Sequence, residues 1–200
     1  MRYVDMNDVA FDTAAIAFPG LGNCHGIVYH TSAGLFAYHA GGNPQDSAGK
    51  AEAFGMFVRN HALGRAAAGI CLYGACPTNR HSAAGTHKSE LQVIARALKF
   101  NGTIKGYRWD LAHLGWTTTY VEFNLNHGAV AVTIEDYTGQ PLTTGVNADA
   151  LGHKFVLQGK DLATMAAGQF AWAKCTTKSD VVIAVTRKLA PPTTVVPTTL

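Results

Sequence analysis

Residues 24 to 39 read CHGIVYHTSAGLFAYH and predict a β-hairpin. Two short apolar runs, 26–29 and 35–38, are separated by a turn that contains Gly34. Short apolar runs joined by a glycine-containing turn are typical of hairpins. Cys24 precedes the first predicted strand and His39 ends the second. The hairpin therefore brings a thiol and an imidazole to the same end of the two strands.

A thiol and an imidazole placed together can act as a nucleophile and its base. Taken singly, each residue is usually structural, because a cysteine is commonly a small buried apolar residue and this chain has nine histidines. The glycine-rich segment 19–23 before Cys24 strengthens the functional interpretation, since glycine lets the backbone approach a substrate closely. We predict Cys24 as nucleophile and His39 as base. The backbone N–H groups of Asn23 and Cys24 are predicted to hold the oxyanion.

The pattern outside the hairpin predicts further strands and two helices. One helix begins within 43–47 and ends at Gly64, and a second begins with a capping-box pattern at Ser89 and closes at 101–102. The predicted strands cover 13–18, 68–73, 103–109, 117–124, 129–135 and 181–185. We expect an α+β fold with layered, mostly antiparallel, sandwich-like sheets and two packed helices.

Length and composition narrow the classes of function. The 200 residues suit one domain over 1–190, followed by an extended Pro- and Thr-rich tail over 191–200. Net charge is only +3 and no basic stripe is interleaved with aromatic residues, so nucleic-acid binding is not predicted. No apolar run approaches the ~18 residues of a membrane span. The acidic N-terminal segment 1–8 does not fit a signal peptide, which predicts synthesis as a cytoplasmic product.

The four cysteines show no C-x-x-C spacing and no dense disulfide pattern, so we expect them to be reduced. One alternative is a zinc site made from Cys71, Cys76, His81 and His87, which follow one another at intervals of five, five and six residues. Cys71 lies inside a predicted strand, which favours a place in the core instead. We therefore predict no metal and no cofactor.

Three short motifs resemble one enzyme family in the same order along the chain. These are LGNC at 21–24, YHAG at 38–41 and ICLYGA at 70–75. They are similar to motifs of cysteine-dependent protein glutamine deamidases of the CheD and cytotoxic necrotizing factor type. The resemblance covers about residues 12 to 136, as an order of elements plus short motifs.

The resemblance implies hydrolysis of a glutamine side chain to glutamate in a target protein. Cys24 and His39 match the family's catalytic pair, and the substrate is a protein rather than a nucleic acid or a membrane. The expected setting is a bacterial effector or toxin made without a signal peptide and secreted into the host cytosol. A chemotaxis-receptor deamidase, a transglutaminase and a catalytically silent binding module on the same fold are the alternatives.

One position departs from the family pattern. CheD-like proteins have a threonine six residues before the nucleophile that orients the histidine, and this chain has Phe18 there. A phenyl ring accepts no conventional hydrogen bond, so another group must hold His39. A backbone carbonyl of the strand 13–18 and the hydroxyl of Thr13 are the two candidates for the third catalytic group. We favour the carbonyl, because Thr13 lies far along the strand.

Overall fold

The computed structural model describes residues 2–4, 6–7, 9–42, 44, 47–61 and 63–137, together with the pairs 153–154, 173–174 and 198–199. The strand predicted at 181–185 lies outside the described residues. So does the predicted tail 191–200, apart from Thr198–Thr199, which pairs with a strand of the larger sheet.

Among the described elements, five strands precede the first helix, and strands and helices then alternate from α1 to β8. The helices are α1 (Ser47–Asn60), α2 (Ala84–Leu98) and α3 (Leu111–Leu114). The strands are β1 (Arg2–Tyr3), β2 (Val9–Asp12), β3 (Ala15–Leu21), β4 (His25–Thr31), β5 (Gly34–Ala40), β6 (Gly69–Pro77), β7 (Thr103–Trp109), β8 (Thr119–Asn126), β9 (Ala129–Asp136), β10 (His153–Lys154), β11 (Ala173–Lys174) and β12 (Thr198–Thr199). None of the helices in the described ranges is long and apolar enough to cross a membrane.

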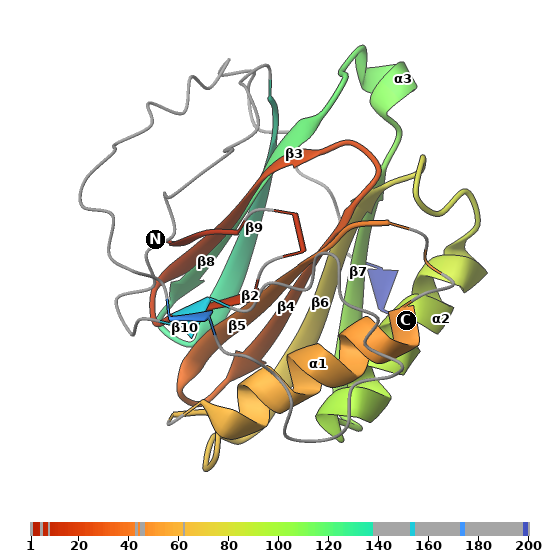
Figure 1. Cartoon of the computed structure of the whole chain (residues 1–200). Helices are drawn as coiled ribbons and strands as arrows, with labels where there is room; N and C mark the ends of the chain where they lie inside the picture. Colours follow the sequence, from red (N-terminus) through yellow and green to blue (C-terminus); the bar gives the residue numbers. More distant parts are fainter. Residues whose placement is uncertain are drawn as a thin grey trace.

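Two sheets and one helix layer stack on one another (Figure 1). The smaller sheet has the order β1-β3-β8-β9, and the larger has β12-β7-β6-β4-β5-β2. Only the pairs β1–β3 and β6–β7 are parallel among the described strands. Helices α1 and α2 cover the face of the larger sheet that points away from the smaller one. The predicted α+β class, with layered and mostly antiparallel sheets, is confirmed.

Strand alternation divides the apolar residues of the larger sheet between two cores. On β4, Ile27 and Tyr29 face the helices, whereas Val28 faces the smaller sheet. Successive side chains of a strand point to opposite faces, so a strand covered on both faces reads as a nearly continuous apolar run. This double burial explains why all seven residues of β4 and all seven of β5 are buried.

The hairpin at 24–39 forms as predicted. Strands β4 and β5 pair antiparallel with Ile27 opposite Tyr38 and Gly26 opposite His39. Thr31 Oγ1 donates to the carbonyl of Gly34 across the turn at 3.1 Å. Both ends of the hairpin are thereby fixed in register.

The start of the second helix was predicted wrongly. Helix α2 begins at Ala84, five residues before Ser89, and its N-cap Ala83 makes no side-chain cap hydrogen bond. Ser89 does not cap the helix, because it lies inside it and its hydroxyl donates to the carbonyl of Gly85 at 2.9 Å; the next residue, Glu90, is buried in an ion-pair network. The C-terminal end is Leu98, followed by Lys99 in the left-handed conformation at φ 56° and ψ 37°.

Candidate active site and the polar cluster beside it

Cys24 and His39 lie at the same end and on the same face of the hairpin. Gly26 is opposite His39, so Cys24, two residues before Gly26 and just ahead of β4, is a diagonal neighbour of His39 on that face. Cys24 is half-buried and packs against the core between the two sheets. His39 is 2% exposed and faces the same core. The structure therefore brings the two residues predicted from sequence into one place.

The third group that orients His39 is a main-chain carbonyl. The distance from His39 Nδ1 to the carbonyl oxygen of Val4 is 2.8 Å. A carbonyl only accepts, so Nδ1 must carry the proton and the neutral imidazole has its lone pair on Nε2. Asn7 also donates its N–H to the carbonyl of His39 at 2.8 Å. The segment after β1 thus holds the tautomer that a general base requires.

Neither Thr13 nor the strand 13–18 supplies this carbonyl. Thr13 is exposed in the turn between β2 and β3, beside Asp12, which pairs with Leu35 at the opposite end of the hairpin from His39. Phe18 instead packs edge-on against the His39 ring, at 5.8 Å between centroids and 84° between planes. A carbonyl was the favoured type of acceptor, but it comes from Val4, because the N-terminal segment pairs alongside β3 and reaches His39.

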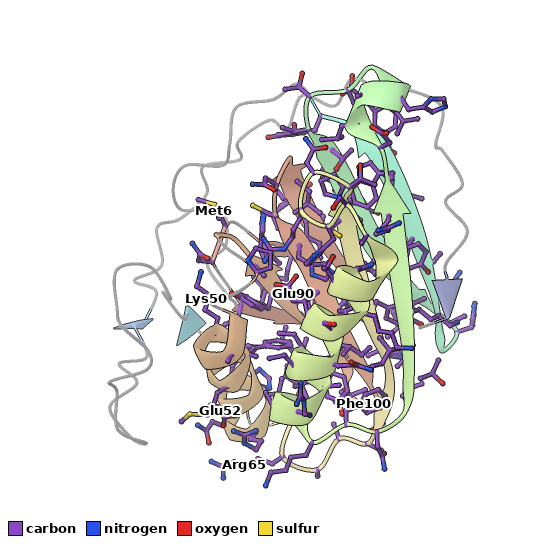
Figure 2. The ribbon with its side chains drawn as sticks, turned by 90° about the vertical axis from the view of Figure 1, so that its right-hand side faces the viewer. Met6, Lys50, Glu52, Arg65, Glu90 and Phe100 are labelled. Carbon is purple, nitrogen blue, oxygen red and sulfur yellow. The ribbon has the colours of Figure 1, made fainter. Side chains whose placement is uncertain are left out.

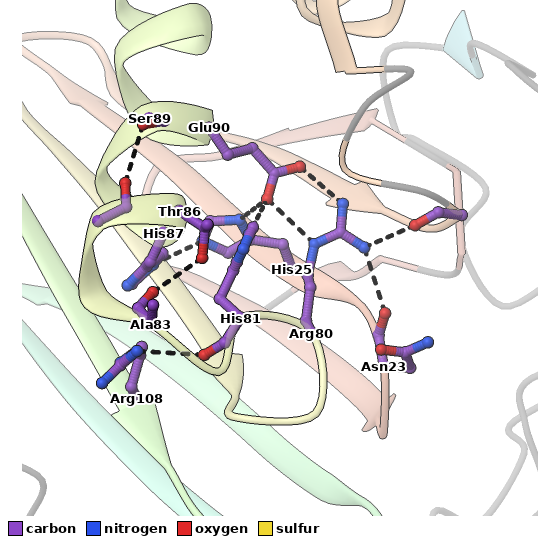
Figure 3. Close-up of polar contacts among 12 residues, drawn as sticks. Asn23, His25, Arg80, His81, Ala83, Thr86, His87, Ser89, Glu90 and Arg108 are labelled. Carbon is purple, nitrogen blue, oxygen red and sulfur yellow. Dashed lines mark hydrogen bonds and ion pairs between the residues drawn. The ribbon is translucent and has the colours of Figure 1, made fainter.

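The turn that carries Cys24 is held by Arg80. One guanidinium nitrogen, Nη1, donates to the carbonyls of Asn23 at 3.2 Å and Gly42 at 2.9 Å, which flank the two ends of the hairpin (Figure 3). In a trans peptide the C=O and the following N–H point in opposite directions. Because Arg80 fixes the Asn23 carbonyl, the N–H of Cys24 points away from Arg80.

Glu90 anchors Arg80 at the centre of a buried polar cluster (Figure 3). Oε1 accepts from Arg80 Nη2 at 2.6 Å, and Oε2 accepts from Arg80 Nε at 3.0 Å, which makes the pair bidentate. Oε2 also lies 2.6 Å from His81 Nε2 and 2.8 Å from His25 Nδ1. Glu90 lies on the side of α2 that faces the larger sheet (Figure 2). The cluster therefore joins α2 to β4 and to the loop after β6.

The charges in this cluster follow from burial and pairing. Burial alone would raise the pKa of Glu90, but His25 and the hydrogen bonds from His25, His81 and Arg80 lower it overall, so the carboxylate is ionised. Burial lowers the pKa of His25 and lowers that of His87 to about 2, so both imidazoles are neutral. The network holds the Arg80–Glu90 ion pair with the neutral imidazoles of His25 and His87 beside it.

The zinc set predicted as an alternative from sequence does not come together. Cys71 and Cys76 lie on opposite faces of β6, with Cys71 in the core between the sheets. His81 is bonded to Glu90. Cys76 and His87 instead converge with His25, a residue that sequence spacing did not link to them. One sequence pattern could have pointed to this cluster. The spacing of His87, Glu90, Leu91 and Ile94 is helical and places two polar residues on the buried side of α2.

Comparison with known proteins adds no relative. A scan of the chain against known protein families found no match, and neither did a search of curated proteins.

Gly26 is the residue that makes room beside the pair. A Cβ at this position would lie 2.9 Å from Cδ2 of Phe18, the ring that packs against His39. We expect Gly26→Ala to lower the free energy of unfolding by about 1–3 kcal/mol through overpacking. Urea denaturation measures this effect. Gly85→Ala is the matched control, because nothing lies within 4 Å of a Cβ built there. A Gly26→Ala protein as stable as the control would contradict the packing argument.

Proposed function

We propose that the protein is a cysteine hydrolase that deamidates a glutamine side chain in another protein. The single observation that carries the proposal is the hydrogen bond between His39 Nδ1 and the Val4 carbonyl. It leaves the Nε2 lone pair to serve as a base, on the face and at the end of the hairpin where Cys24 lies. A thiol beside an oriented imidazole is suited to acyl transfer.

The proposed reaction proceeds through a thioester. His39 Nε2 takes the proton of the Cys24 thiol, and the sulfur attacks the carbon of the glutamine side-chain amide. The tetrahedral oxyanion is held by the backbone N–H groups of Asn23 and Cys24. His39 returns the proton to the leaving nitrogen, and ammonia departs. Water, deprotonated by His39, then attacks the thioester, which releases glutamate and the free thiol.

The substrate class comes from the family resemblance and the reaction class from the pair. Cys24 and His39 alone support acyl chemistry on an amide. The motifs at 21–24 and 38–41 direct the proposal to protein glutamine, with a bacterial effector acting in a host cell as the setting. A transglutaminase would use the same thioester and replace water with an amine.

The test is proteomic. A eukaryotic lysate is treated with the wild-type protein or with Cys24→Ser, and peptides are searched for glutamine converted to glutamate. Conversion by the wild type and none by Cys24→Ser is the expected result, because a serine hydroxyl is a poorer nucleophile at neutral pH. Cys71→Ser is the control, since that thiol is buried in the core. Identical peptide profiles for the wild type and Cys24→Ser would favour the silent binding module instead.

Thr13 is expected to be dispensable. Its exposed position at the far end of the hairpin keeps its hydroxyl away from His39. We predict that Thr13→Ala retains activity to within about tenfold of the wild type, well short of the ~10²–10⁴ that a positioned base contributes. Initial rates on the substrate found above measure this. A thousandfold loss in folded Thr13→Ala would make the hydroxyl the third catalytic group.

A further inference from the structure

Three potential metal ligands from different elements converge on the helix-facing side of the larger sheet. They are His25 at the start of β4, Cys76 near the end of β6 and His87 in the second turn of α2. One ligand atom from each lies within 4.8 Å of the others, and all three residues are buried. The nitrogens His25 Nε2 and His87 Nε2 are 3.1 Å apart. Two nitrogens bound to one tetrahedral zinc at ~2.0–2.1 Å are separated by about 3.3 Å, which is close to this distance.

The hydrogen bonds around His25 fix it as a ligand. Arg80 keeps the Glu90 carboxylate ionised, so Glu90 accepts and His25 Nδ1 donates at 2.8 Å. In the metal-free protein the Nε2 lone pair of His25 then accepts a hydrogen bond from His87 Nε2 at 3.1 Å, and Cys76 Sγ belongs to the same group of ligand atoms within 4.8 Å of one another. A carboxylate that accepts from the far nitrogen of a ligating histidine is the usual outer partner in zinc proteins.

The space for this arrangement is provided by Gly74. A Cβ at that position would lie 2.5 Å from His25 Nε2 and inside the contact distance of Leu91. Any larger residue would displace the imidazole from the centre of the group. A groove of about 460 Å³ is lined by Arg80, His81 and Glu90, among others, but by none of the three ligands.

We propose that His25 Nε2, His87 Nε2 and Cys76 Sγ bind a zinc ion, with a water molecule as the fourth ligand. Two imidazoles and a thiolate are ligands that suit zinc. On binding, Cys76 releases its proton to solvent, and the proton of His87 resides on Nδ1. The other possible grouping, His25, His81 and Glu90, is less suitable because Arg80 already occupies both oxygens of that carboxylate.

The zinc site would link β4, β6 and α2. One of its ligands, His25, directly follows the proposed nucleophile in the sequence. Cys24 precedes His25, so a metal on His25 would anchor the strand end that carries Cys24. Cys24 itself faces the other side of the sheet and is not a ligand. Zinc binding is therefore independent of the proposed hydrolase activity. A protein that binds no zinc could still deamidate glutamine, and an inactive protein could still bind zinc.

Cobalt binding tests the proposal without any activity assay. The full-length protein is stripped with EDTA and titrated with Co²⁺. We expect saturation at one ion per chain, with a thiolate-to-cobalt charge-transfer band that added zinc bleaches. Absence of that band in the folded wild type would overturn the proposal.

Three cysteine variants identify which thiol binds the metal. Cys76→Ala should lose the charge-transfer band and bind cobalt more weakly by over a hundredfold, beyond the ~10–100-fold typical of an outer partner. Cys71→Ala and Cys24→Ala should keep the band and the affinity. A band that survives in Cys76→Ala, or is lost in Cys71→Ala, contradicts the assignment.

A measurement on the wild type covers the case in which Cys76→Ala does not fold. The zinc-loaded and EDTA-treated proteins are alkylated in moderate urea, and each cysteine is quantified by peptide mass spectrometry. Zinc should protect Cys76 selectively, relative to Cys71 and Cys24. Equal modification of Cys76 with and without zinc would overturn the proposal.

Discussion

Replacing Glu90 with alanine is expected to lower the free energy of unfolding of the metal-free protein by about 3–5 kcal/mol. The Arg80 side chain is 1% exposed, and Glu90 accepts both hydrogen bonds of its bidentate ion pair. Without the carboxylate, a guanidinium remains charged in the interior, because arginine does not lose its proton in proteins. His25 and His81 lose their acceptor as well. Urea denaturation followed by circular dichroism measures the loss.

An exposed ion pair provides the control for this prediction. Arg59 Nη2 and Glu52 Oε1 are 2.6 Å apart on α1, with side chains 36% and 56% exposed. Exposed pairs contribute about 0–1 kcal/mol, so Glu52→Ala should stay within that range. A Glu90→Ala protein that loses no more stability than Glu52→Ala would show that the buried cluster does not hold the sheet and α2 together.

Replacing His39 with alanine is expected to lower the rate of glutamine deamidation by about 10²–10⁴-fold. In the proposed mechanism the imidazole takes the thiol proton and passes it to the leaving nitrogen, and no other histidine is diagonal to Cys24 on that face of the hairpin in the described structure. His25 follows Cys24 directly but points to the opposite face, toward Glu90. Initial rates under saturating substrate measure the effect.

His113→Ala is the control for the His39 variant. His113 is exposed on α3 and is not part of the hairpin, and its substitution should leave the rate unchanged. Circular dichroism shows whether each variant is folded. A folded His39→Ala protein with the activity of His113→Ala would remove His39 from the mechanism.

The hairpin and the juxtaposition of Cys24 and His39 could be predicted because the information is local. Apolar runs on both sides of Gly34 specify two strands, and a hairpin fixes which residues meet at its open end. The same local logic predicted β7 over 103–109 and the strands 117–124 and 129–135, which the structure joins by a turn at His127 and Gly128, both with positive φ. In each case neighbouring residues determine the conformation.

The groups that surround Cys24 and His39 could not be predicted because they are distant in sequence. The Val4 carbonyl is 35 residues from His39 and belongs to the main chain, so no side-chain pattern marks it. Arg80 reaches Asn23 across 57 residues. Ser89 was interpreted as the start of the second helix because its local context fits a capping box, whereas it lies inside α2, and the neighbouring Glu90 is a buried counter-ion of Arg80.

The rate of alkylation of Cys24 tests the central claim most directly, namely that His39 activates this thiol. Wild type, His39→Ala and His113→Ala are treated with iodoacetamide at neutral pH, and the modification of Cys24 is followed by peptide mass spectrometry. An unassisted thiol is only a few per cent thiolate at pH 7, so the rate should fall by about tenfold or more in His39→Ala and stay unchanged in His113→Ala. Equal rates in all three proteins, with His39→Ala folded, would contradict the pairing of Cys24 with His39.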